Sequence, residues 1–450
     1  MGTYESYQDY KNSQNSWIGT IPKHWNIQRA DFLIQTNRRQ VSAESLDGVE
    51  LIHYSIPNVQ EFGTGKMENG DQIDSAKLLI SEQQLLVSKL NPRKSTLCIA
   101  VPNDQYTVVA SSEFVPLLAG KTHLEYSYYV WGSDKVTKLL SSMVQSVTRS
   151  HQRVNPSDIL KIYWAWPPLH EQKAIAHFLD HKTAQIDALI AKKQSLLDKL
   201  GEQRSSLINQ AVTKGVNVAV PMKESGVAWL GEIPRHWETK RLRFLMTMSG
   251  GLTPRTSEPR YWGGDIPWVS PKDMKSERLS SSIDTLTEDA LNETTLRLYP
   301  PGKVLIVVRG MILAHTFPVA VNEVPVTVNQ DMKVLETTMN PEYLAVLLRG
   351  IQSLVLSIVE ESAHGTKVLR TDLLKDMVLP VPPRVEQDEI VSEVARISSR
   401  IDKMVSTVTA VITKLQEYRS ALITNAVTGK IDVRDFSIPT TTEQREVAHG

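Results

Sequence analysis

The chain has 450 residues and a mass of 50.5 kDa, enough for two or three domains that each bury a core. Its 50 Lys and Arg residues balance 50 Asp and Glu residues, which excludes a protein that coats nucleic acid with a uniformly positive surface. One cysteine, Cys98, excludes a disulfide within the chain and favours a reducing compartment. No apolar run approaches the roughly 18 residues of a membrane span, and no signal peptide is recognisable, so we expect a cytoplasmic protein with no membrane contact.

In chain order, residues 1–16 are polar and predict a flexible extension. The motif Ile-Gly-Thr-Ile-Pro-Lys-His-Trp follows at residues 18–25, and Leu-Gly-Glu-Ile-Pro-Arg-His-Trp repeats it at residues 230–237. A period of roughly 215 residues is far longer than a solenoid repeat, so the chain is a tandem duplication of domain-sized halves. We expect Trp25 and Trp237 to anchor each globular part to a helix, with His24 and His236 packed beside them.

The globular part of each half predicts a mixture of strands and helices. Short apolar runs between turn residues predict strands at 85–87, 107–109, 304–308 and 325–328, and longer stretches predict helices at 125–147 and 341–359. The duplication persists here, since Val87-Ser88-Lys89, Ser112-Glu113-Phe114 and Glu125-Tyr126 correspond to Val307-Val308-Arg309, Gln330-Asp331-Met332 and Glu342-Tyr343. Elsewhere the two globular parts differ, which indicates two related domains that recognise different things.

Two long helical segments, each opened by Pro-Pro-x-x-Glu-Gln, follow the globular parts and align without a gap. The second has apolar residues at alternating steps of four and three: Ile390, Val394, Ile397, Ile401, Met404, Val408, Val411, Leu415, Tyr418 and Leu422. The corresponding positions of the first are Ile175, Leu179, Lys182, Ile186, Leu189, Lys193, Leu196, Leu200, Gln203 and Leu207. These heptads predict that the two segments pair as one antiparallel coiled coil, a spacer about 60 Å long.

The sequence lacks familiar catalytic motifs. Gly120-Lys121-Thr122 ends like a phosphate-binding loop, but Val115 stands where that loop requires its first glycine. None of the Pro-Pro pairs forms the Asn/Asp/Ser-Pro-Pro-aromatic motif of amino-methyltransferases. His177 and His181 have zinc-ligand spacing but no adjacent glutamate base. We therefore expect no catalytic residue, no metal site and no cofactor in this chain.

Basic and polar clusters in turn-rich stretches favour DNA binding instead. Arg and Lys pair with guanine, Asn and Gln pair with adenine, and Ser, Thr and Lys mostly contact phosphates, although a solvated loop is the alternative for each single residue. In the first half the candidates are Arg38, Arg39, Lys89, Asn91, Arg93, Lys94, Arg149, His151, Gln152 and Arg153. In the second half they are Arg255, Thr256, Arg260, Trp262, Ser270, Lys272, Arg309, Asn329, Gln330, His364, Thr366 and Lys367.

Taken together, the repeated Ile-Pro-x-His-Trp motif, the Gly-Gly-Asp-Ile-Pro-Trp-Val stretch at 263–269 and the Pro-Pro-x-x-Glu-Gln helices resemble the DNA-specificity subunit of type I restriction-modification enzymes. The resemblance implies an α+β fold with two mixed α/β target recognition domains, two long antiparallel coiled-coil helices and a pseudo-twofold from tandem duplication. It implies recognition domains at 1–165 and 216–380, conserved helices at 166–215 and 381–430, and a flexible tail at 431–450.

The same resemblance implies a non-catalytic subunit that reads a bipartite site in double-stranded DNA. Its implied partners are two methyltransferase subunits and two restriction subunits, and S-adenosylmethionine, ATP and magnesium are expected in those partners. Positions on the helices that we expect to dock partners are Glu171, Gln172, Arg204, Glu386, Gln387 and Arg419, with plain solvation of the helix as the alternative. A stand-alone bipartite DNA-binding regulator and a coiled-coil adaptor between two protein-binding domains remain open alternatives.

Overall fold

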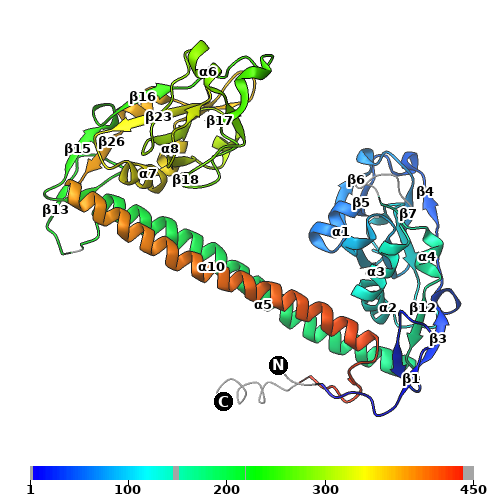
Figure 1. Ribbon diagram of the computed structural model, residues 1–450. Helices are drawn as coiled ribbons and strands as arrows, with labels where there is room; N and C mark the ends of the chain where they lie inside the picture. The colour runs from blue at the N-terminus through cyan, green and yellow to red at the C-terminus, as the bar shows by residue number, and fades with distance from the viewer. Residues whose placement is uncertain (1–3, 145–151, 218, 439–450) are drawn as a thin grey trace. The chain divides into compact units, whose positions relative to one another are not determined.

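A computed structural model describes residues 4–144, 152–217 and 219–438 (Figure 1). The chain divides into two compact units, each with a globular part, called here a head, and one portion of two long helices. The first unit comprises Met1–Lys193 and Ala410–Gly450, and the second comprises Gln194–Thr409. The fold is α+β, as the sequence predicts.

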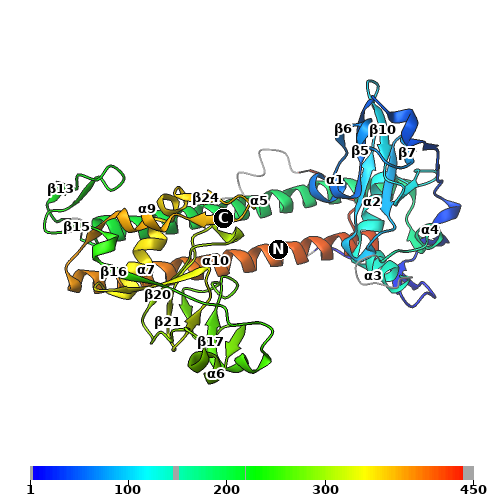
Figure 2. The same ribbon diagram turned by 90° about the horizontal axis from the view of Figure 1, so that it is seen from above.

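The first head contains a five-stranded mixed sheet in the order β4-β7-β10-β5-β6 and an antiparallel sheet in the order β11-β8-β9. Figure 2 shows β6, β5, β10 and β7 side by side. The strands are β1 (Tyr10–Asn12), β2 (Thr20–Pro22), β3 (Asn26–Arg29), β4 (Gln40–Val41), β5 (Glu50–Tyr54), β6 (Lys66–Asn69), β7 (Lys77–Leu79), β8 (Gln84–Ser88), β9 (Leu97–Ala100), β10 (Thr107–Ala110), β11 (Phe114–Leu117) and β12 (Tyr163–Trp166), and the helices are α1 (Ile56–Phe62), α2 (Leu124–Gly132), α3 (Asp134–Ser142) and α4 (Pro156–Leu160).

The second head has a five-stranded sheet in the order β16-β23-β20-β21-β18 and a three-stranded sheet in the order β19-β17-β22. Its strands are β13 (Met222–Glu224), β14 (Glu232–Pro234), β15 (Glu238–Arg241), β16 (Met246–Gly250), β17 (Trp262–Val269), β18 (Arg278–Leu279), β19 (Asp284–Leu286), β20 (Val304–Val307), β21 (Val319–Asn322), β22 (Thr327–Val328), β23 (Met332–Thr337), β24 (Val359–Glu361), β25 (Lys367–Leu369) and β26 (Val378–Val381), and its helices are α6 (Glu288–Glu293), α7 (Pro341–Gly350), α8 (Gln352–Leu356) and α9 (Thr371–Asp376). The heads therefore differ in their sheets.

The duplication is preserved in the strands that adjoin the long helices. The repeated motif forms the second strand of an antiparallel two-stranded ribbon in each unit. This strand is β2, paired with β1, in the first unit and β14, paired with β13, in the second. A second matched ribbon pairs β3 with β12 and β15 with β26. Each of β12 and β26 leads through Pro-Pro directly into a long helix, so these ribbons hold the head to its helix.

The strand predictions at 85–87, 107–109 and 304–308 are confirmed by β8, β10 and β20. Every residue of β8 and of β20 is buried, because a continuous apolar run can only be covered on both faces inside a core. The two predicted head helices are wrong as single helices. Helix α2 ends at Gly132, and Ser133 accepts a hydrogen bond from the backbone of Val136 to begin α3. Residues 341–359 likewise divide into α7, α8 and the first residue of β24.

Helices α5 (Leu169–Lys214) and α10 (Arg384–Val427) run side by side and antiparallel (Figure 1). In the first unit, Arg419 of α10 pairs with Asp187 of α5 at 2.8 Å. In the second unit, Arg204 of α5 pairs with Asp402 of α10 at 2.9 Å. Partners that advance along α5 retreat along α10, so the predicted antiparallel pairing is confirmed.

The predicted heptad seam is only partly correct. Ile186, Leu200 and Ile401 are at most 6% exposed, but Leu189 and Met404 are 47% and 44% exposed. Beyond residue 186, Ile190 and Leu197 are half-buried while Leu189 and Leu196 are exposed, and on the other helix Val405 and Ile412 are half-buried while Met404 and Val411 are exposed. The covered positions are 186, 190, 193, 197 and 200 on α5 and 401, 405, 408, 412 and 415 on α10, so the seven-residue repeat of a coiled coil is kept and one position of each heptad is shifted by one residue.

Both chain ends are more ordered than the sequence predicts. Tyr7 is 4% exposed and packs edge-on against Trp25, which contradicts a flexible segment across all of residues 4–16. Val433 is 3% exposed, and the backbone N–H of Asp432 donates to the carbonyl of Glu5 at 2.8 Å. The prediction of a flexible tail is therefore wrong for residues 431–438, because apolar side chains there complete the core of the first unit. Residues 439–450 lie outside the described part.

Within the described residues, no helix is long and apolar enough to cross a membrane. The same part of the chain holds no group of three or more His, Cys, Asp or Glu side chains arranged to bind a metal ion. His177 and His181 instead lie against the ring of Phe436, with centroid distances of 6.1 and 5.7 Å. Cys98 is buried in the first head, and burial raises the pKa of its thiol to about 12.

Candidate nucleic-acid interface

In the first head, three chain segments meet where β8 ends at Ser88. The N–H of Lys89 donates to the carbonyl of Glu113 at 3.0 Å, just before β11. The N–H of Val154 donates to the carbonyl of Lys89 at 2.9 Å, and the N–H of Asn91 donates to the carbonyl of Gln152 at 2.7 Å. The structure therefore brings Lys89, Asn91 and Gln152 together, although more than 60 residues separate the first from the last.

The charge at this junction is positive. The guanidinium of Arg153 lies 2.9 Å from a carboxyl oxygen of Glu113, and the ammonium of Lys89 lies 3.9 Å from the other. Arg93 and Lys94 are exposed on the adjoining turn. Two cations thus pair with one carboxyl group and two more are exposed on the adjoining turn, which leaves a local positive excess that suits a phosphate backbone.

Backbone strain shapes the turn that carries Arg93 and Lys94. Asn91 has a φ of 49° and Ser95 a φ of 46°, so both take the left-handed conformation that non-glycine residues seldom adopt. Pro92 between them is buried and fixes the start of the turn. Left-handed residues on both flanks reverse the chain within a few residues, which pushes the two basic side chains outward.

In the second head, a matching junction lies where β20 ends at Val307. The N–H groups of Val308 and Arg309 donate to the carbonyl of Asp331 at 2.8 and 3.3 Å, just before β23. The N–H of Gly310 donates to the carbonyl of Lys367 at 2.9 Å, and Arg309 bridges to Val368. The third segment is here the hairpin of β24 and β25, whose turn carries His364 and Thr366.

The two junctions have the same plan. Lys89 and Arg309 each follow a fully buried strand, and each donates its backbone N–H to the carbonyl of an acidic residue, Glu113 or Asp331. A third segment then pairs with the chain beside the basic residue in both heads. We call these the first and second basic junctions. Sequence reasoning named the cations and missed Glu113 and Asp331 as their organisers, although the alignment of the duplicated halves already set these two acids opposite each other.

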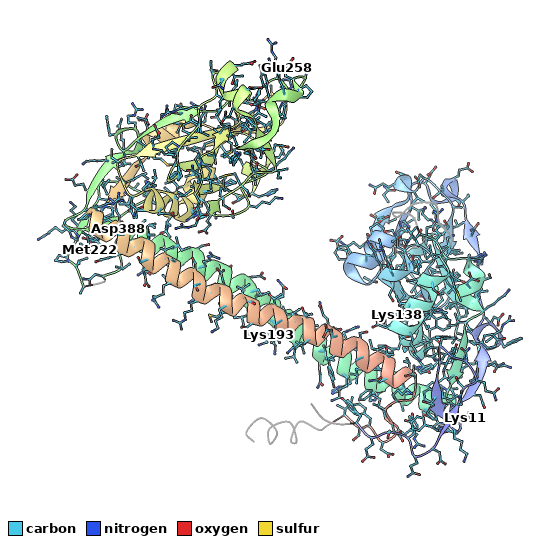
Figure 3. All side chains as sticks on the ribbon, viewed as in Figure 1. Lys11, Lys138, Lys193, Met222, Glu258 and Asp388 are labelled. Atoms are coloured by element: carbon cyan, nitrogen blue, oxygen red, sulfur yellow. The ribbon has the colours of Figure 1, made fainter. Side chains whose placement is uncertain are left out.

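Other candidates in the second head are committed to contacts within the protein. The guanidinium of Arg260 makes two hydrogen bonds to Glu293, at 2.8 and 2.6 Å, and lies 3.3 Å from Glu258. These carboxyl groups, Glu258 first, raise the pKa of Arg260. The indole N–H of Trp262 donates to the carbonyl of Arg255 at 3.3 Å. Figure 3 shows Glu258 at the edge of the second head away from Asp388 on α10.

Two candidates are buried and serve the loop geometry. Ser270 is 6% exposed, and its hydroxyl donates to Asp273 at 2.8 Å. Asn329 is also 6% exposed, and its side-chain oxygen accepts from the N–H of Asp331 at 3.1 Å. Gln330 is exposed and accepts a hydrogen bond from the hydroxyl of Thr253. Burial leaves Ser270 and Asn329 as supports of the turns on which exposed neighbours stand.

The remaining candidates lie elsewhere. Arg38 and Arg39 are exposed just before β4, on the edge of the five-stranded sheet and not at the first basic junction. Arg255, Thr256 and Lys272 are exposed in loops around β17. Lys367 is half-buried, and its ammonium lies 2.6 Å from Glu361 across the hairpin. Arg149 and His151 fall outside the described residues.

The predicted partner-docking positions at the helix starts are not exposed. Glu171 is 1% exposed, and its carboxyl group accepts from the hydroxyl of Tyr7, from the indole N–H of Trp25 at 2.9 Å and from the ring of His24 at 2.8 Å. The prediction of an exposed face is therefore wrong for Glu171. The roles expected for Trp25 and His24 as a packed anchor are confirmed by these contacts.

The second unit repeats this anchor. The indole N–H of Trp237 donates to Glu386 at 2.8 Å, and the ring of His236 lies 2.5 Å from the other oxygen. The glutamine of each motif is also buried, since Gln172 and Gln387 are 3% and 4% exposed. Each donates its amide to a proline carbonyl, Pro167 or Pro382, at 2.9 Å. The Glu-Gln pairs therefore close the start of each helix against its head, which excludes an exposed face for Gln172 and Gln387.

The other end of each helix joins the opposite head in the same way. The hydroxyl of Tyr126 donates to the carbonyl of Val427 at 3.3 Å, and that of Tyr343 donates to the carbonyl of Val212 at 3.2 Å. Arg204 and Arg419, also predicted to dock partners, form the cross-helix ion pairs described above and are about one-third exposed. Each head thus holds the start of one long helix and the end of the other.

Comparison with known proteins finds one family model and several relatives that match part of the chain. Residues 234–413 match a protein-family model described as the type I restriction modification DNA specificity domain. Among curated proteins, the chain is 31% identical over 168 residues to the type I restriction enzyme MjaIX specificity subunit of Methanocaldococcus jannaschii, covering 36% of this chain and 38% of that protein. It is 29% identical over 243 residues to the EcoR124I/EcoR124II specificity subunit of Escherichia coli, covering 53% of each. The aligned parts therefore span less than two thirds of both relatives.

Solved structures share the fold along most of the chain. A chain from a study of complex assembly and conformational transition of the type I R-M system has a TM-score of 0.70 at 14% identity, covering 90% of this chain and 98% of that chain. The HsdS subunit from Thermoanaerobacter tengcongensis has a TM-score of 0.51 at 16% identity, covering 91% and 98%. At these identities the likeness concerns the fold.

Proposed function

We propose that the chain is the DNA-reading subunit of a type I restriction enzyme complex, because residues 234–413 match the DNA specificity domain model and the similar curated proteins are specificity subunits of such enzymes. Each head reads one half of an asymmetric bipartite site in double-stranded DNA. The chain directs adenine methylation and restriction without catalysing either. Two methyltransferase subunits and two restriction subunits supply the chemistry, together with S-adenosylmethionine, ATP and magnesium.

The observation that carries this proposal is the pair of basic junctions. Lys89 and Arg309 stand at equivalent strand ends in two heads whose sheets otherwise differ. A shared framework with different surroundings is what two readers of different half-sites require, because phosphate contacts position a protein while base contacts discriminate. Exposed Arg93, Lys94 and Arg153 in the first head, and Arg309 with Gln330 in the second, are the side chains that we assign to DNA.

The helix pair sets the distance between the half-sites and docks the methyltransferase subunits. The exposed apolar side chains of Leu189, Leu196, Met404 and Val411 support docking here in place of the buried Glu171, Gln172 and Gln387. Large apolar side chains in water favour a protein neighbour when they follow one another along a surface.

The helix pair as a ruler has a direct test. A change of about four residues near 211–215 would cut into Ala211, Val212 and Thr213, which are buried against the second head. We therefore place one added heptad after Lys193 and one after Thr409. Seven helical residues add roughly 10 Å, or about three base pairs. The methylated motif should gain about three undefined positions in its spacer, and an unchanged spacer would refute the ruler.

The proposed function itself is tested by mapping methylated adenines across the genome of cells that hold this chain with its methyltransferase. Cells that lack only this chain should lose one bipartite motif. Lys89→Ala with Arg153→Ala should relax one half of the motif, and Arg309→Ala should relax the other, each by a factor that corresponds to about 1–3 kcal/mol. Lys11→Ala, an exposed lysine of β1 labelled in Figure 3, is the control and should change neither half.

Two rival functions give different results in the same cells. A stand-alone regulator would bind a bipartite site tightly without partners, with affinity that falls steeply as salt rises, and the methylation map would not change. A coiled-coil adaptor would show no preference among DNA sequences. If the head variants left both half-sites intact, the assignment of the basic junctions to DNA would be wrong even where the deletion removes methylation.

A further inference from the structure

The helix pair of the second unit contains a hollow of about 300 Å³ between α5 and α10. Leu207, Ile397 and Met404 supply apolar walls, and Gln203, Arg396 and Arg400 supply polar ones. Met404 is 44% exposed and Arg400 is exposed, so the hollow opens to solvent. No described residue of the second unit fills it.

The corresponding place in the first unit is filled by the ends of this same chain. Because the two helical segments align without a gap, Ile397, Arg396 and Gln203 correspond to Lys182, His181 and Tyr418. In the first unit, the ring of Phe436 lies 5.7 Å from the ring of His181 and 5.8 Å from the ammonium of Lys182. The hollow of the second unit is therefore the open counterpart of an occupied site.

Two aromatic side chains make up the filling. The ring of Phe436 packs edge-on against Phe178 at a centroid distance of 5.0 Å. The ring of Tyr4 packs against Phe178 at 5.3 Å, and burial raises the pKa of the Tyr4 hydroxyl to about 12. Glu393 holds the position of Phe178 in the second unit and forms an ion pair with Arg396 at 2.6 Å.

The difference follows from how the chain leaves each long helix. After α10 the described chain enters no further helix or strand, and Phe436 lies against Phe178 of α5. After α5 the chain must enter β13 at Met222, so only residues 215–221 are available. That short connection leads to the head, and none of its described residues lines the hollow of the second unit.

The charges around the two places are alike. In the first unit the aromatic residue follows Asp435, and the wall carries Lys182. In the second unit the wall carries Arg396 and Arg400 against the single carboxyl group of Glu393. A cationic rim around an apolar floor favours an aromatic ring with an acidic neighbour, because the ring fills the floor and a carboxylate pairs with the exposed guanidinium.

We propose that this hollow is a docking site for an aromatic residue that follows an acidic residue on an extended segment of a partner polypeptide. The Asp435-Phe436 segment of this chain mimics that partner in the first unit. The two corresponding sites on the long helices are thus unequal. The site in the first unit is occupied by Phe436 of the same chain, and the site in the second unit is open to a partner. The proposal deepens the docking role of the helix pair and needs no DNA, so its test is independent of base recognition.

The test uses the full-length chain and the peptide Lys-Ile-Asp-Val-Arg-Asp-Phe-Ser, the sequence of residues 430–437, with a fluorescent label. Fluorescence anisotropy should show saturable binding, and replacing the phenylalanine of the peptide by alanine should weaken it at least tenfold. A photoreactive phenylalanine analogue in the peptide should attach to α10 between residues 396 and 404. Ile397→Glu should weaken binding at least tenfold, whereas Lys182→Glu, the matched variant of the occupied site, should leave it within twofold.

Arg400→Glu provides a second variant on an exposed residue, whose helix should keep its melting temperature, and it should weaken the acidic peptide about fivefold. Absence of binding, binding that survives Ile397→Glu, or attachment only to α5 near Phe178 would overturn the proposal. Concentration-dependent dimers of the full chain that disappear in Phe436→Ala would overturn it in favour of a second copy of this chain. None of these outcomes depends on methylation, so failure here would leave the proposed function standing.

Discussion

The anchor between the first head and the helix pair is built from the same contacts as the anchor of the second head. The first anchor is buried, and the second is partly exposed to solvent. Trp25 and Trp237 are both fully buried and both donate to a glutamate. The side chain of Glu171 is 1% exposed and that of Glu386 is 31% exposed. Identical residues therefore work in different solvent environments.

The cause is a residue that only the first unit possesses. The hydroxyl of Tyr7 donates to Glu171. Burial, as the larger cause, and this hydrogen bond both raise the pKa of Tyr7. The guanidinium of Arg434 lies 5.1 Å from the ring of Tyr7 on the outer side. The comparison shows that the duplicated motif supplies the anchor, whereas the chain ends determine how far the glutamate of each anchor is exposed to solvent.

The largest expected effect comes from removing either tryptophan. Trp25→Ala and Trp237→Ala should each cost about 3–5 kcal/mol of unfolding free energy, because each leaves a cavity in a core shared by head and helices. Hydrogen exchange should accelerate mainly in α5 up to Lys193 for Trp25→Ala, and mainly in α10 up to Thr409 for Trp237→Ala. Equal acceleration in both units would contradict the idea that each tryptophan anchors only the head of its own unit.

The glutamates should separate the two junctions. Glu171→Gln should cost about 2–3 kcal/mol, and Glu386→Gln about 1 kcal/mol, because water can replace part of the lost interaction only at the exposed site. Urea denaturation of each variant measures the difference. Tyr7→Phe in the Glu171→Gln background should cost less than Tyr7→Phe alone, since the two groups share one hydrogen bond. Additive losses would show that Tyr7 does not dry the anchor.

The glycines that end the long helices sharpen the same contrast. Gly215 and Gly429 have positive φ angles of 80° and 68°, so alanine at either position is strained by about 1–2 kcal/mol. A Cβ at Gly429 would also lie 2.4 Å from the side chain of Pro22, whereas one at Gly215 would keep 3.2 Å from Trp237. Gly429→Ala should therefore lower the melting temperature more than Gly215→Ala, and the reverse order would contradict the tighter first junction.

The smallest effect belongs to the ion pairs across the helices. Arg419→Ala and Arg204→Ala should each cost less than about 1 kcal/mol, because both pairs are substantially exposed. Arg419 makes two hydrogen bonds to Asp187, so its loss should be the larger of the two. Urea denaturation at low and at high salt should show that the difference in unfolding free energy between the two variants becomes smaller as salt rises. A difference that persists at high salt would indicate that the aliphatic part of the arginine side chain stabilises the helix pair by packing.

Sequence reasoning worked best where a residue's role depends on near neighbours. The buried strands β8 and β20 contain three and four consecutive apolar residues, so their location in a core followed directly. The helix pair and the tandem duplication followed from periodicity and repetition. The basic junctions could be named only as separate clusters, because nothing local says that Gln152 meets Asn91 or that the turn at Thr366 meets Arg309.

The failures among the candidate site residues have one physical origin, the burial of groups that appear polar in the sequence. Glu171 and Gln387 were expected on an exposed helix face, since a glutamate or glutamine in a helix is normally solvated. Ser270 and Asn329 were expected at the DNA surface, and each is buried with a partner in its own loop. Burial of a polar side chain requires a partner at the right distance, which no sequence position reveals.

The sequence by itself determined the duplication, the α+β class, the two long helices and the absence of familiar catalytic motifs, because these depend on composition, spacing and local periodicity. The tertiary structure alone decided which polar residues seal the anchors of the heads, which apolar positions of each heptad the helix pair covers, and which hollow the chain ends occupy. Those features depend on contacts between residues hundreds of positions apart, whose free energy exists only once the chain has brought them together.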